Sequence, residues 1–254
     1  MTIVEKAALA ERAARASGEM LEHHGAFKVR RKSENDFVTE MDYASERLIR
    51  ETLLSACPED AFFGEETGGA QRAHGRWIVD PIDGTANFMR GYRLYTISIA
   101  YEQEGQLMAG CVYCPGTGEL FLGVRGQGAT LNGRPIHASA TSVLSDALVC
   151  AGFGHRDPAV MRRTLSILPG VLTSVSDLRR SGTCAYDLCC VADGRCDGYI
   201  ERALSYYDYA AGYVILTEAG GRFTGWDAGE DALATGNLLA TNGVLHEALR
   251  EKLA

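Results

Sequence analysis

The chain has 254 residues, of which 46% are hydrophobic and 23% charged, so it fits one globular domain or two small, closely joined ones. Its formal net charge of −8 disfavours direct binding to nucleic acid or to an anionic membrane. Because the N-terminal segment carries charges throughout, we expect neither a signal peptide nor a membrane span, and we expect the eight cysteines to be reduced thiols of a cytoplasmic protein.

The first part of the chain predicts two helices and then strands. Apolar residues at helical spacing predict helices at residues 3–23 and 39–56. The basic run between them, residues 28–32, is interpreted as a solvated loop. Two short apolar strands follow at residues 61–63 and 77–79. The second is apolar without alternation, which predicts burial on both of its faces.

A meander of strands is predicted next, and the rest of the chain alternates strands with helices. The meander runs from residue 94 to about 131, with glycine-containing turns between its strands. In chain order, the later elements are a strand at 146–153, a helix at 160–168, a strand at 171–179, a helix ending near 192, a strand at 196–201, a helix at 208–218, a strand at 238–242 and a helix at 243–253. This alternation predicts a layered α/β architecture, with a soft subdomain boundary near residue 140.

Two carboxylates stand three residues apart at the end of the strand at 77–79, in the segment DPIDGT from Asp80 to Thr85. In a straight strand, a spacing of three places them on opposite faces. Pro81 indicates that the strand ends there, so that a turn would bring both carboxylates together and Asp83 would open a helix. Oxygen ligands beside an anion-binding backbone suit Mg²⁺ and phosphate. The alternative, a helix cap at Asp83 and a turn residue at Asp80, stays open on this motif alone.

Further acidic residues stand at the ends of other predicted elements. Glu65 and Glu66 follow the strand at 61–63, Asp36 and Asp42 flank the start of the second helix, and Asp208 begins an apolar helix. Each alone is explained as a helix cap or an exposed loop acid.

Together these motifs resemble the inositol monophosphatase family. The matching segments are the GEE motif at 64–66, D-x-V-T-x-x-D at 36–42, WIVDPIDGTANF at 77–88, SGT at 181–183 and the second signature at 207–221. Their order and spacing agree with the family from about residue 5 to 252. Tyr207 departs from it, since many members carry Trp there, which affects packing beside a metal ligand and not the ligand itself.

The resemblance implies a fold and an activity. The fold is the αβαβα sandwich of the sugar phosphatases, commonly a homodimer, with a metal- and phosphate-binding half at 1–140 and a substrate-binding half at 141–254. The activity is Mg²⁺-dependent, Li⁺-sensitive hydrolysis of a small polyol or sugar phosphate, with inositol 1-phosphate as the first expectation. Fructose 1,6-bisphosphate, histidinol phosphate and 3′-phosphoadenosine 5′-phosphate are the alternatives within the family. The segment Ala86-Asn87-Phe88 is similar to the inositol branch.

The resemblance also implies residue roles. The implied ligands for two Mg²⁺ ions and a weaker third are Glu65, Asp80, the Ile82 carbonyl, Asp83 and Asp208. The implied substrate contacts are Asp83, Gly84, Thr85, Gly182, Thr183, Cys184, Glu201 and Asp208. Glu65 and Thr85 are implied to act on the attacking water, with Asp36 supporting Thr85. Arg31 or Lys32 matches a basic residue on the loop over the site.

Electrostatics supports a metal requirement independently of the resemblance. The four acids Glu65, Asp80, Asp83 and Asp208 would repel one another and would repel phosphate. Bound Mg²⁺ reverses the sign of such a site, so metal is expected to be needed for substrate binding as well as for chemistry. The expected mechanism is in-line attack by a metal-activated water, without a covalent enzyme intermediate.

Three alternative interpretations of the sequence are two other phosphatase mechanisms and a non-enzymatic role. An aspartyl-phosphate phosphatase would carry its two aspartates two apart, whereas Asp80 and Asp83 are three apart. Cys189 and Arg195 satisfy the C-x5-R pattern of cysteine phosphatases, but Cys189 falls in a predicted helix and is interpreted as a core thiol. A non-enzymatic role, as a regulatory partner of the transcription machinery, is the alternative from another class. Separately, Cys111 and Cys114 lack a second pair of zinc ligands and are interpreted as strand residues.

Overall fold

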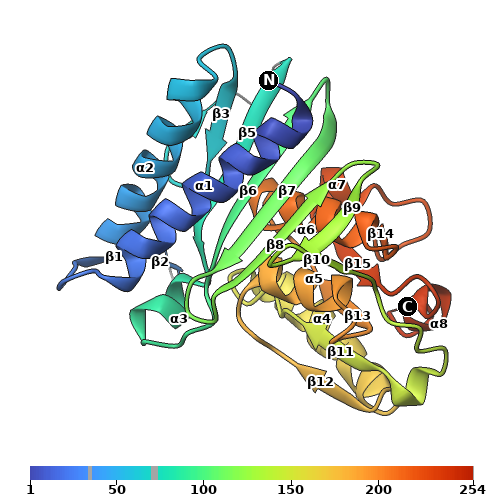
Figure 1. Ribbon diagram of the computed structural model, residues 1–254. Helices are drawn as coiled ribbons and strands as arrows, with labels where there is room; N and C mark the ends of the chain where they lie inside the picture. The colour runs from blue at the N-terminus through green and yellow to red at the C-terminus, as the bar shows by residue number, and fades with distance from the viewer. Residues whose placement is uncertain (34–35, 70–73, 254) are drawn as a thin grey trace.

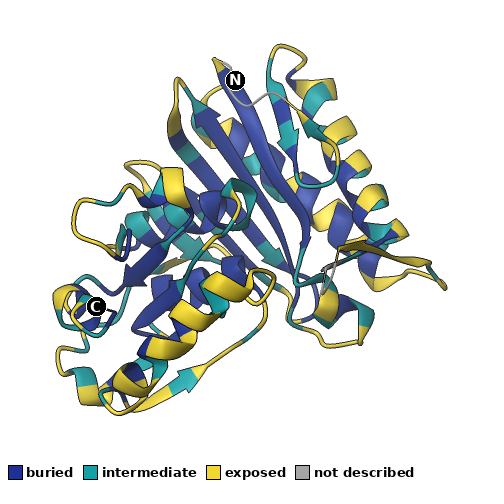
Figure 2. Cartoon of the chain, turned by 180° about the vertical axis from the view of Figure 1, so that it is seen from behind, coloured by how far each residue is buried: buried dark blue, intermediate teal, exposed yellow. Residues whose placement is uncertain are grey.

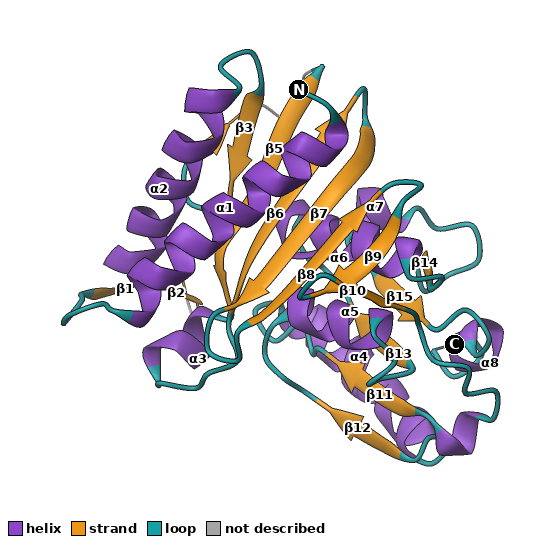
Figure 3. Cartoon of the chain, viewed as in Figure 1, coloured by secondary structure: helices purple, strands orange, loops and turns teal. Residues whose placement is uncertain are grey.

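The computed structural model describes residues 1–33, 36–69 and 74–253, with Asp36 described by its backbone alone. In this part of the chain the elements stack in five layers that alternate helices and sheets (Figures 1 and 3). This is the predicted αβαβα arrangement.

The first large sheet has eight strands, in the order β10-β9-β8-β7-β6-β5-β3-β4. Their bounds are β3 Ala61–Gly64, β4 Gly68–Gly69, β5 Gly75–Asp83, β6 Thr96–Gln103, β7 Gln106–Cys114, β8 Glu119–Val124, β9 Gly128–Leu131 and β10 Arg134–Ile136. Strands β5 to β10 form an antiparallel meander, whereas β3 and β5 run parallel. The ends of β3 and β5 therefore lie at the same edge of the sheet.

The second large sheet has five strands, in the order β12-β11-β13-β15-β14. They are β11 Leu148–Ala151, β12 Asp177–Arg179, β13 Gly198–Glu201, β14 Arg222–Thr224 and β15 Leu238–Thr241. Strand β11 runs parallel to both β12 and β13, so these three strands also end at one edge. The boundary predicted near residue 140 falls between the two sheets in the sequence.

The helices form the other three layers. They are α1 Ile3–Glu22, α2 Glu40–Ala56, α3 Thr85–Met89, α4 Pro158–Leu172, α5 Cys184–Ala192, α6 Tyr206–Glu218, α7 Ala232–Thr235 and α8 His246–Arg250, with a 3₁₀ turn at Leu144–Asp146. Helices α1 and α2 cover one face of the first sheet (Figure 1). Helices α5 and α6 lie between the two sheets, and α4 and α8 pack on the outer face of the second. No helix of the described segments has the length and apolar character needed to cross a membrane.

The apolar strand at 77–79 is buried on both faces, as its composition predicts. Trp77 and Val79 pack with α1 and α2, while Ile78 packs with α5 and α6 on the other side. All three side chains are essentially inaccessible to solvent. Figure 2 shows the resulting pattern, with buried central strands and outer helices that expose one side.

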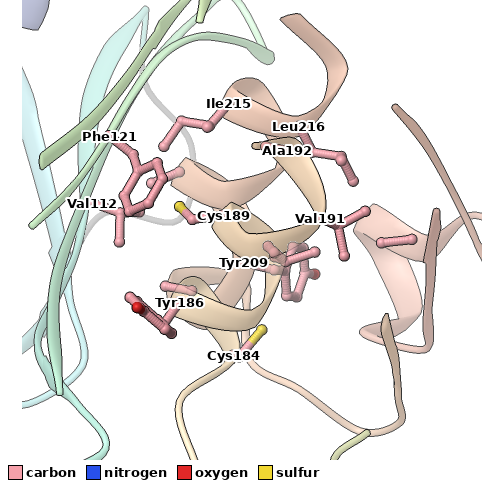
Figure 4. Packing of buried hydrophobic residues seen from close by; sticks show 14 of the residues in the cluster. Val112, Phe121, Cys184, Tyr186, Cys189, Val191, Ala192, Tyr209, Ile215 and Leu216 are labelled. Atoms are coloured by element: carbon pink, nitrogen blue, oxygen red, sulfur yellow. The ribbon is translucent and has the colours of Figure 1, made fainter. Parts of the chain in front are cut away.

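The middle layer packs closely on the first sheet. Every residue of α5 is buried, and Figure 4 shows its side chains packed with those of α6 and the first sheet. Helix α6 lies so close to β7 that a Cβ atom at Gly110 would come within 2.3 Å of the Ala211 carbonyl oxygen. Glycine at this position lets the helix backbone rest directly on the strand.

Two expectations about local structure were wrong. In the segment 171–179, predicted as a strand, the first two residues belong to helix α4, the next four form a turn, and only Asp177–Arg179 is extended. Thr164, Ile167 and Val171 are buried at helical spacing, so the period of the buried face overrides the strand preference of the β-branched residues. The basic run at 28–32, predicted as a loop, is mostly strand β1, Val29–Ser33, which pairs with β2, Asp36–Thr39. Strand β1 is exposed along its whole length and gave no alternating pattern.

Candidate active site

A cleft of about 400 Å³ lies where the carboxyl ends of parallel strands from both sheets meet. Ligands bind in α/β proteins at such edges. The cleft is lined by the predicted site residues Glu65, Asp80, Ile82, Asp83, Gly84, Thr85, Gly182, Thr183, Cys184, Glu201 and Asp208. The structure therefore brings together every predicted site residue except Asp36, whose side chain lies outside the described part.

A β-bulge places Asp80 and Asp83 on the same cleft. Asp80 pairs with Ser98 and Asp83 with Thr96, so three steps along β5 match two along β6. The extra residue cancels the alternation that would put the two carboxylates on opposite faces. Pro81 cannot donate to the ladder, which explains the bulge at this point. The strand thus continues to Asp83. The sequence-based expectation that it ends at Pro81 was wrong.

Asp83 links the two halves of the molecule. Its Oδ2 atom accepts hydrogen bonds from the Ala185 backbone N–H, at 2.8 Å, and from the Thr183 hydroxyl. Both donors come from the start of α5 or its cap. The predicted metal ligand Asp83 and the predicted substrate residue Thr183 are therefore in direct contact.

Glu65 follows β3 in a turn that is held from beneath by Glu46 of α2. The Glu46 carboxylate accepts hydrogen bonds from the backbone N–H groups of Glu66, at 2.7 Å, and Thr67, at 3.0 Å. Glu46 is almost fully buried. Glu46 was not predicted, because in the sequence it is one more acid in a helix. Its position on the inner face of α2 is the signal that could have identified it.

Asp208 lies in the first turn of α6. Its Oδ2 atom accepts the Ser205 backbone N–H at 2.7 Å, which fixes the rotamer while the side chain lines the cleft. The neighbouring Tyr207 ring packs against Phe63, with centroids 6.1 Å apart, so the departure from Trp is accommodated by an aromatic contact.

Burial and neighbouring charges raise the pKa values of three aspartates in the cleft. Burial first, and then the charges of Glu65, Asp83 and Asp208, raise the pKa of Asp80 well above its usual value. Burial likewise raises the pKa of Asp83 to about 6 and that of Asp208 well above normal, with further contributions from neighbouring carboxylates. Glu65, Asp80, Asp83 and Asp208 bring four carboxylates to one cleft, and carboxylate oxygens are the hard donors that Mg²⁺ prefers. The residues therefore fit a divalent cation.

Lys32, in strand β1, is the basic residue that contacts the acids following β3. Its Nζ lies 3.1 Å from Glu65 Oε1 and 2.6 Å from Glu66 Oε1. Burial opposes the lysine charge, but the two glutamates outweigh burial and raise the pKa of Lys32. Arg31, the alternative in the sequence, instead places its guanidinium 5.3 Å from the centre of the Phe37 ring.

Asp42 is the acid that contacts Thr85. The Thr85 hydroxyl lies 3.2 Å from Asp42 Oδ1 and 3.1 Å from the Ile82 carbonyl oxygen. Asp42 also caps α2, because its Oδ2 accepts the Thr39 backbone N–H at 2.7 Å. Burial raises the pKa of Asp42 to about 6. The resemblance to the family implies this support for Asp36, and a role for Asp36 stays a prediction. The sequence signal for Asp42 is the capping pattern Thr39-x-x-Asp42.

Glu201 ends β13 and faces the cleft from the second sheet. It accepts a hydrogen bond from the Tyr199 hydroxyl, and burial raises its pKa. A Cβ atom at Gly152 would lie 1.9 Å from the Glu201 carboxylate, so the carboxylate occupies space that only glycine leaves open. Gly152 itself was not predicted.

The cysteine-based alternatives are not supported by the structure. Cys189 is fully buried in α5, burial raises its pKa, and Arg195 pairs with Glu119 and Asp193. Cys111 and Cys114 are buried on opposite faces of β7, in different core clusters. The eight cysteines are all buried free thiols.

Known proteins match nearly the whole chain. The sequence profile of the inositol monophosphatase family matches residues 4–254. The chain belongs to the inositol monophosphatase family. The chain is therefore a phosphoric monoester hydrolase. Its family is generally metal-dependent, in agreement with the acidic cleft.

Individual relatives of this family member carry two kinds of name. An inositol-1-monophosphatase of Rhizobium meliloti is 40% identical over 223 residues, 87% of this chain and 84% of the relative. A Nus factor SuhB of Haemophilus influenzae is 37% identical over 238 residues, 91% of this chain and 89% of the relative. The crystal structure of the extragenic suppressor protein suhB from Bartonella henselae superposes with a TM-score of 0.92 at 35% identity, covering 96% of each chain.

Proposed function

We propose that this phosphatase hydrolyses a phosphate monoester of a small polyol or sugar in a Mg²⁺-dependent reaction, with inositol 1-phosphate as the first candidate substrate. The single observation that carries the proposal is the convergence of Glu65, Asp80, Asp83 and Asp208 on one cleft beside Gly84 and Thr85. The name of the Rhizobium meliloti relative supports the choice of inositol 1-phosphate.

The acidic side of the cleft would hold the cation and the phosphate. Glu65, Asp80, the Ile82 carbonyl, Asp83 and Asp208 are the proposed ligands of two Mg²⁺ ions and a weaker third. When bound, Mg²⁺ supplies a water of lowered pKa and neutralises charge on the phosphate and the leaving oxygen. The backbone N–H groups of Gly84 and Thr85 would bind the phosphate oxygens.

The attacking water would be oriented by Thr85. Since the Thr85 hydroxyl can donate its hydrogen to Asp42, its oxygen is left to accept a hydrogen bond from the water. Glu65, at the same end of the cleft, would accept a proton from that water. On the opposite wall, Glu201 would accept a hydrogen bond from a substrate hydroxyl, with Gly182, Thr183 and Cys184 beside it.

The test is phosphate release from inositol 1-phosphate, fructose 1,6-bisphosphate, histidinol phosphate and 3′-phosphoadenosine 5′-phosphate, each with Mg²⁺ and with EDTA. We expect turnover that EDTA abolishes and Li⁺ inhibits. Turnover that persists in EDTA would overturn the metal assignment, and preference for another ester would change the substrate while keeping the chemistry.

A second candidate function is a regulatory role in transcription, favoured by the relatives named Nus factor SuhB. The net charge of −8 argues for a protein partner over direct nucleic-acid contact. The variant Asp83→Asn distinguishes the two functions. A regulatory protein would keep its partner and its cellular effect in this variant, whereas an enzyme would lose its phosphatase activity. No turnover of any ester would favour the regulatory role.

The proposal also covers the oligomeric state and the cellular compartment of the protein. We propose a homodimer, as is common in this family, which light scattering of the purified chain tests directly. The eight free thiols support the predicted reducing cytoplasm.

A further inference from the structure

The inner face of helix α2 carries three polar side chains among its apolar residues. Asp42, Ser45 and Glu46 are each no more than 1% exposed. Their spacing of three and four residues places them on one side of the helix, together with Ile49 and Leu53, which pack on the first sheet. Burying a polar group costs free energy unless it finds a hydrogen-bond partner. The partners of these three side chains therefore show what this face of the helix does.

Each of the three side chains contacts a different segment of the active site. Asp42 Oδ1 lies 3.2 Å from the Thr85 hydroxyl. The Ser45 hydroxyl donates to the Pro81 carbonyl oxygen at 3.0 Å, within the bulge of β5. Glu46 accepts hydrogen bonds from the turn after β3. A single helix thus connects three segments that carry proposed cation ligands or phosphate contacts.

Both oxygen atoms of the Glu46 carboxylate are used in this contact. Oε2 accepts the Glu66 N–H at 2.7 Å, whereas Oε1 accepts the Thr67 N–H at 3.0 Å and also the Thr67 hydroxyl. A Cβ atom at Gly64 would lie 2.4 Å from Oε2, so glycine leaves the space that the carboxylate occupies. Glu65 is therefore flanked on both sides by residues that are packed on Glu46 or bonded to it.

The Ser45 contact extends to a second helix. The Ser17 hydroxyl of α1 lies 2.6 Å from the Ser45 hydroxyl, and both groups are fully buried. Since Ser45 gives its hydrogen to the Pro81 carbonyl, Ser17 is the donor in the pair of hydroxyls. The bulge of β5 is thus held, through Ser45, by both helices that cover the first sheet.

These contacts leave the proposed cation ligands free. Glu46 and Ser45 bond to main-chain groups beside the ligands, while the carboxylates of the ligands line the cleft. Without a cation, neighbouring carboxylates repel one another and push apart the segments that carry them. The hydrogen bonds from α2 oppose this separation, and they do so without depending on an ion.

We propose that Glu46 and Ser45 are positioning residues, which hold the main chain beside Glu65 and Asp80 at the separation that a cation needs before any ion binds. Glu46 fixes the turn after β3, Ser45 fixes the bulge of β5, and helix α2 sets the distance between them. This inference rests on the proposed function, because it takes Glu65 and Asp80 as cation ligands. A site that is ordered in advance loses less conformational freedom on binding, so it binds its ion more tightly.

The first experiment is calorimetric titration of the substrate-free chain with Mg²⁺. Glu46→Gln replaces one acceptor oxygen by an amide group that can only donate, and Ser45→Ala removes the hydroxyl. Glu51→Gln and Ser55→Ala, at exposed positions of the same helix, are the matched controls. We expect the Mg²⁺ dissociation constant to rise about tenfold or more in Glu46→Gln and about threefold in Ser45→Ala, and to stay unchanged in both controls.

A variant pair at Thr67 tests the same contact from the surface. Thr67 is exposed, so its substitution leaves the core intact. Thr67→Val removes the hydroxyl that donates to Glu46, and we expect it to raise the Mg²⁺ dissociation constant about threefold. Thr67→Ser keeps the hydroxyl and should bind Mg²⁺ as the unmodified chain does. If circular dichroism shows that Glu46→Gln does not fold, the Thr67 pair decides alone.

Hydrogen exchange in EDTA measures the contact without any ion. The N–H groups of Glu66 and Thr67 should be protected in the unmodified chain and should exchange about tenfold faster in Glu46→Gln, as for a lost hydrogen bond to a carboxylate. In the phosphatase assay, the Mg²⁺ concentration that gives half the maximal rate should rise in parallel with the dissociation constant, while kcat at saturating Mg²⁺ falls by less. A general loss of structure would instead lower kcat at every Mg²⁺ concentration.

Two results would overturn the positioning role. One is an unchanged Mg²⁺ dissociation constant in every folded variant among Glu46→Gln, Ser45→Ala and Thr67→Val. The other is an unmodified chain that binds no Mg²⁺. Failure of the proposed function would look different: a chain that binds Mg²⁺ but hydrolyses no ester would lose the function, and weaker Mg²⁺ binding in these variants would still establish the positioning role.

Discussion

The two sheets contribute different charged residues to the same cleft. The first sheet contributes Glu65, Asp80 and Asp83 at the ends of β3 and β5, whereas the second contributes Arg180 and Arg202 at the ends of β12 and β13. Burial and neighbouring carboxylates raise the pKa values of Asp80 and Asp83, while the guanidinium groups of Arg180 and Arg202 lie over aromatic rings. The difference is that the first sheet offers a cluster of carboxylate oxygens, whereas the second offers guanidinium groups beside the single carboxylate Glu201 at the end of β13.

The largest effect is expected where the acidic edge is broken. Asp83→Asn removes a proposed metal ligand and keeps an oxygen for the Ala185 N–H, so kcat should fall about 10³-fold, the order expected for losing several kcal/mol of charge stabilisation. Phosphate release measures the rate, and circular dichroism checks that the fold is unchanged. A kcat near that of the unmodified chain would show that the acidic edge is not the catalytic one.

A smaller loss is expected from Thr85→Ala, which removes the hydroxyl between Asp42 and the proposed water. We expect kcat to fall about 10²-fold, the scale of a lost proton-positioning group, with KM changed less. Thr85→Ser is the matched control, because it keeps the hydroxyl and should retain most of the rate. If the Ser variant is as slow as the Ala variant, the methyl group matters and the hydroxyl does not.

A change confined to the second sheet should act on substrate binding. In Gly152→Ala the new Cβ would displace the Glu201 carboxylate, and we expect KM to rise about tenfold, as for a lost hydrogen bond to a charged group. Gly170→Ala in α4 is the control, since a Cβ there meets nothing within 4 Å. An unchanged KM for Gly152→Ala would remove Glu201 from the substrate site.

The smallest effect concerns stability without metal. Asp83 has a folded pKa of about 6 against an unfolded value of about 3.9, so its neutral form favours folding below pH 4 and this stability is lost as the pH rises through 6. In EDTA the melting temperature should therefore fall between pH 4 and 6, and saturating Mg²⁺ should flatten the slope. Asp83→Asn cannot ionise, so its slope in EDTA should be shallower; identical slopes would contradict the assignment.

Local patterns predicted the layers and the acidic site, and missed what depends on non-local pairing. Helices α1, α2 and α6 and the strand at 77–79 follow from periodicity and apolar runs. The bulge that turns Asp83 toward Asp80 depends on the partner strand β6, which the motif does not contain. Arg180 and Arg202 are ordinary charged residues in sequence, and only the parallel register of β11, β12 and β13 brings them together.

The close contact of α6 with β7 sets the distance between Asp208 and the acids of the first sheet. Asp208 lies at the start of α6, and the distance between that helix and the first sheet is fixed where Gly110 faces the Ala211 carbonyl. Adding a methyl group at Gly110 would act as a spacer beneath the helix and move Asp208 away from Asp80 without altering any charged residue. The spacing of the proposed ligands Asp80 and Asp208 is thus set by an uncharged contact in the core, so the size of the ion that the proposed site accepts depends on helix packing.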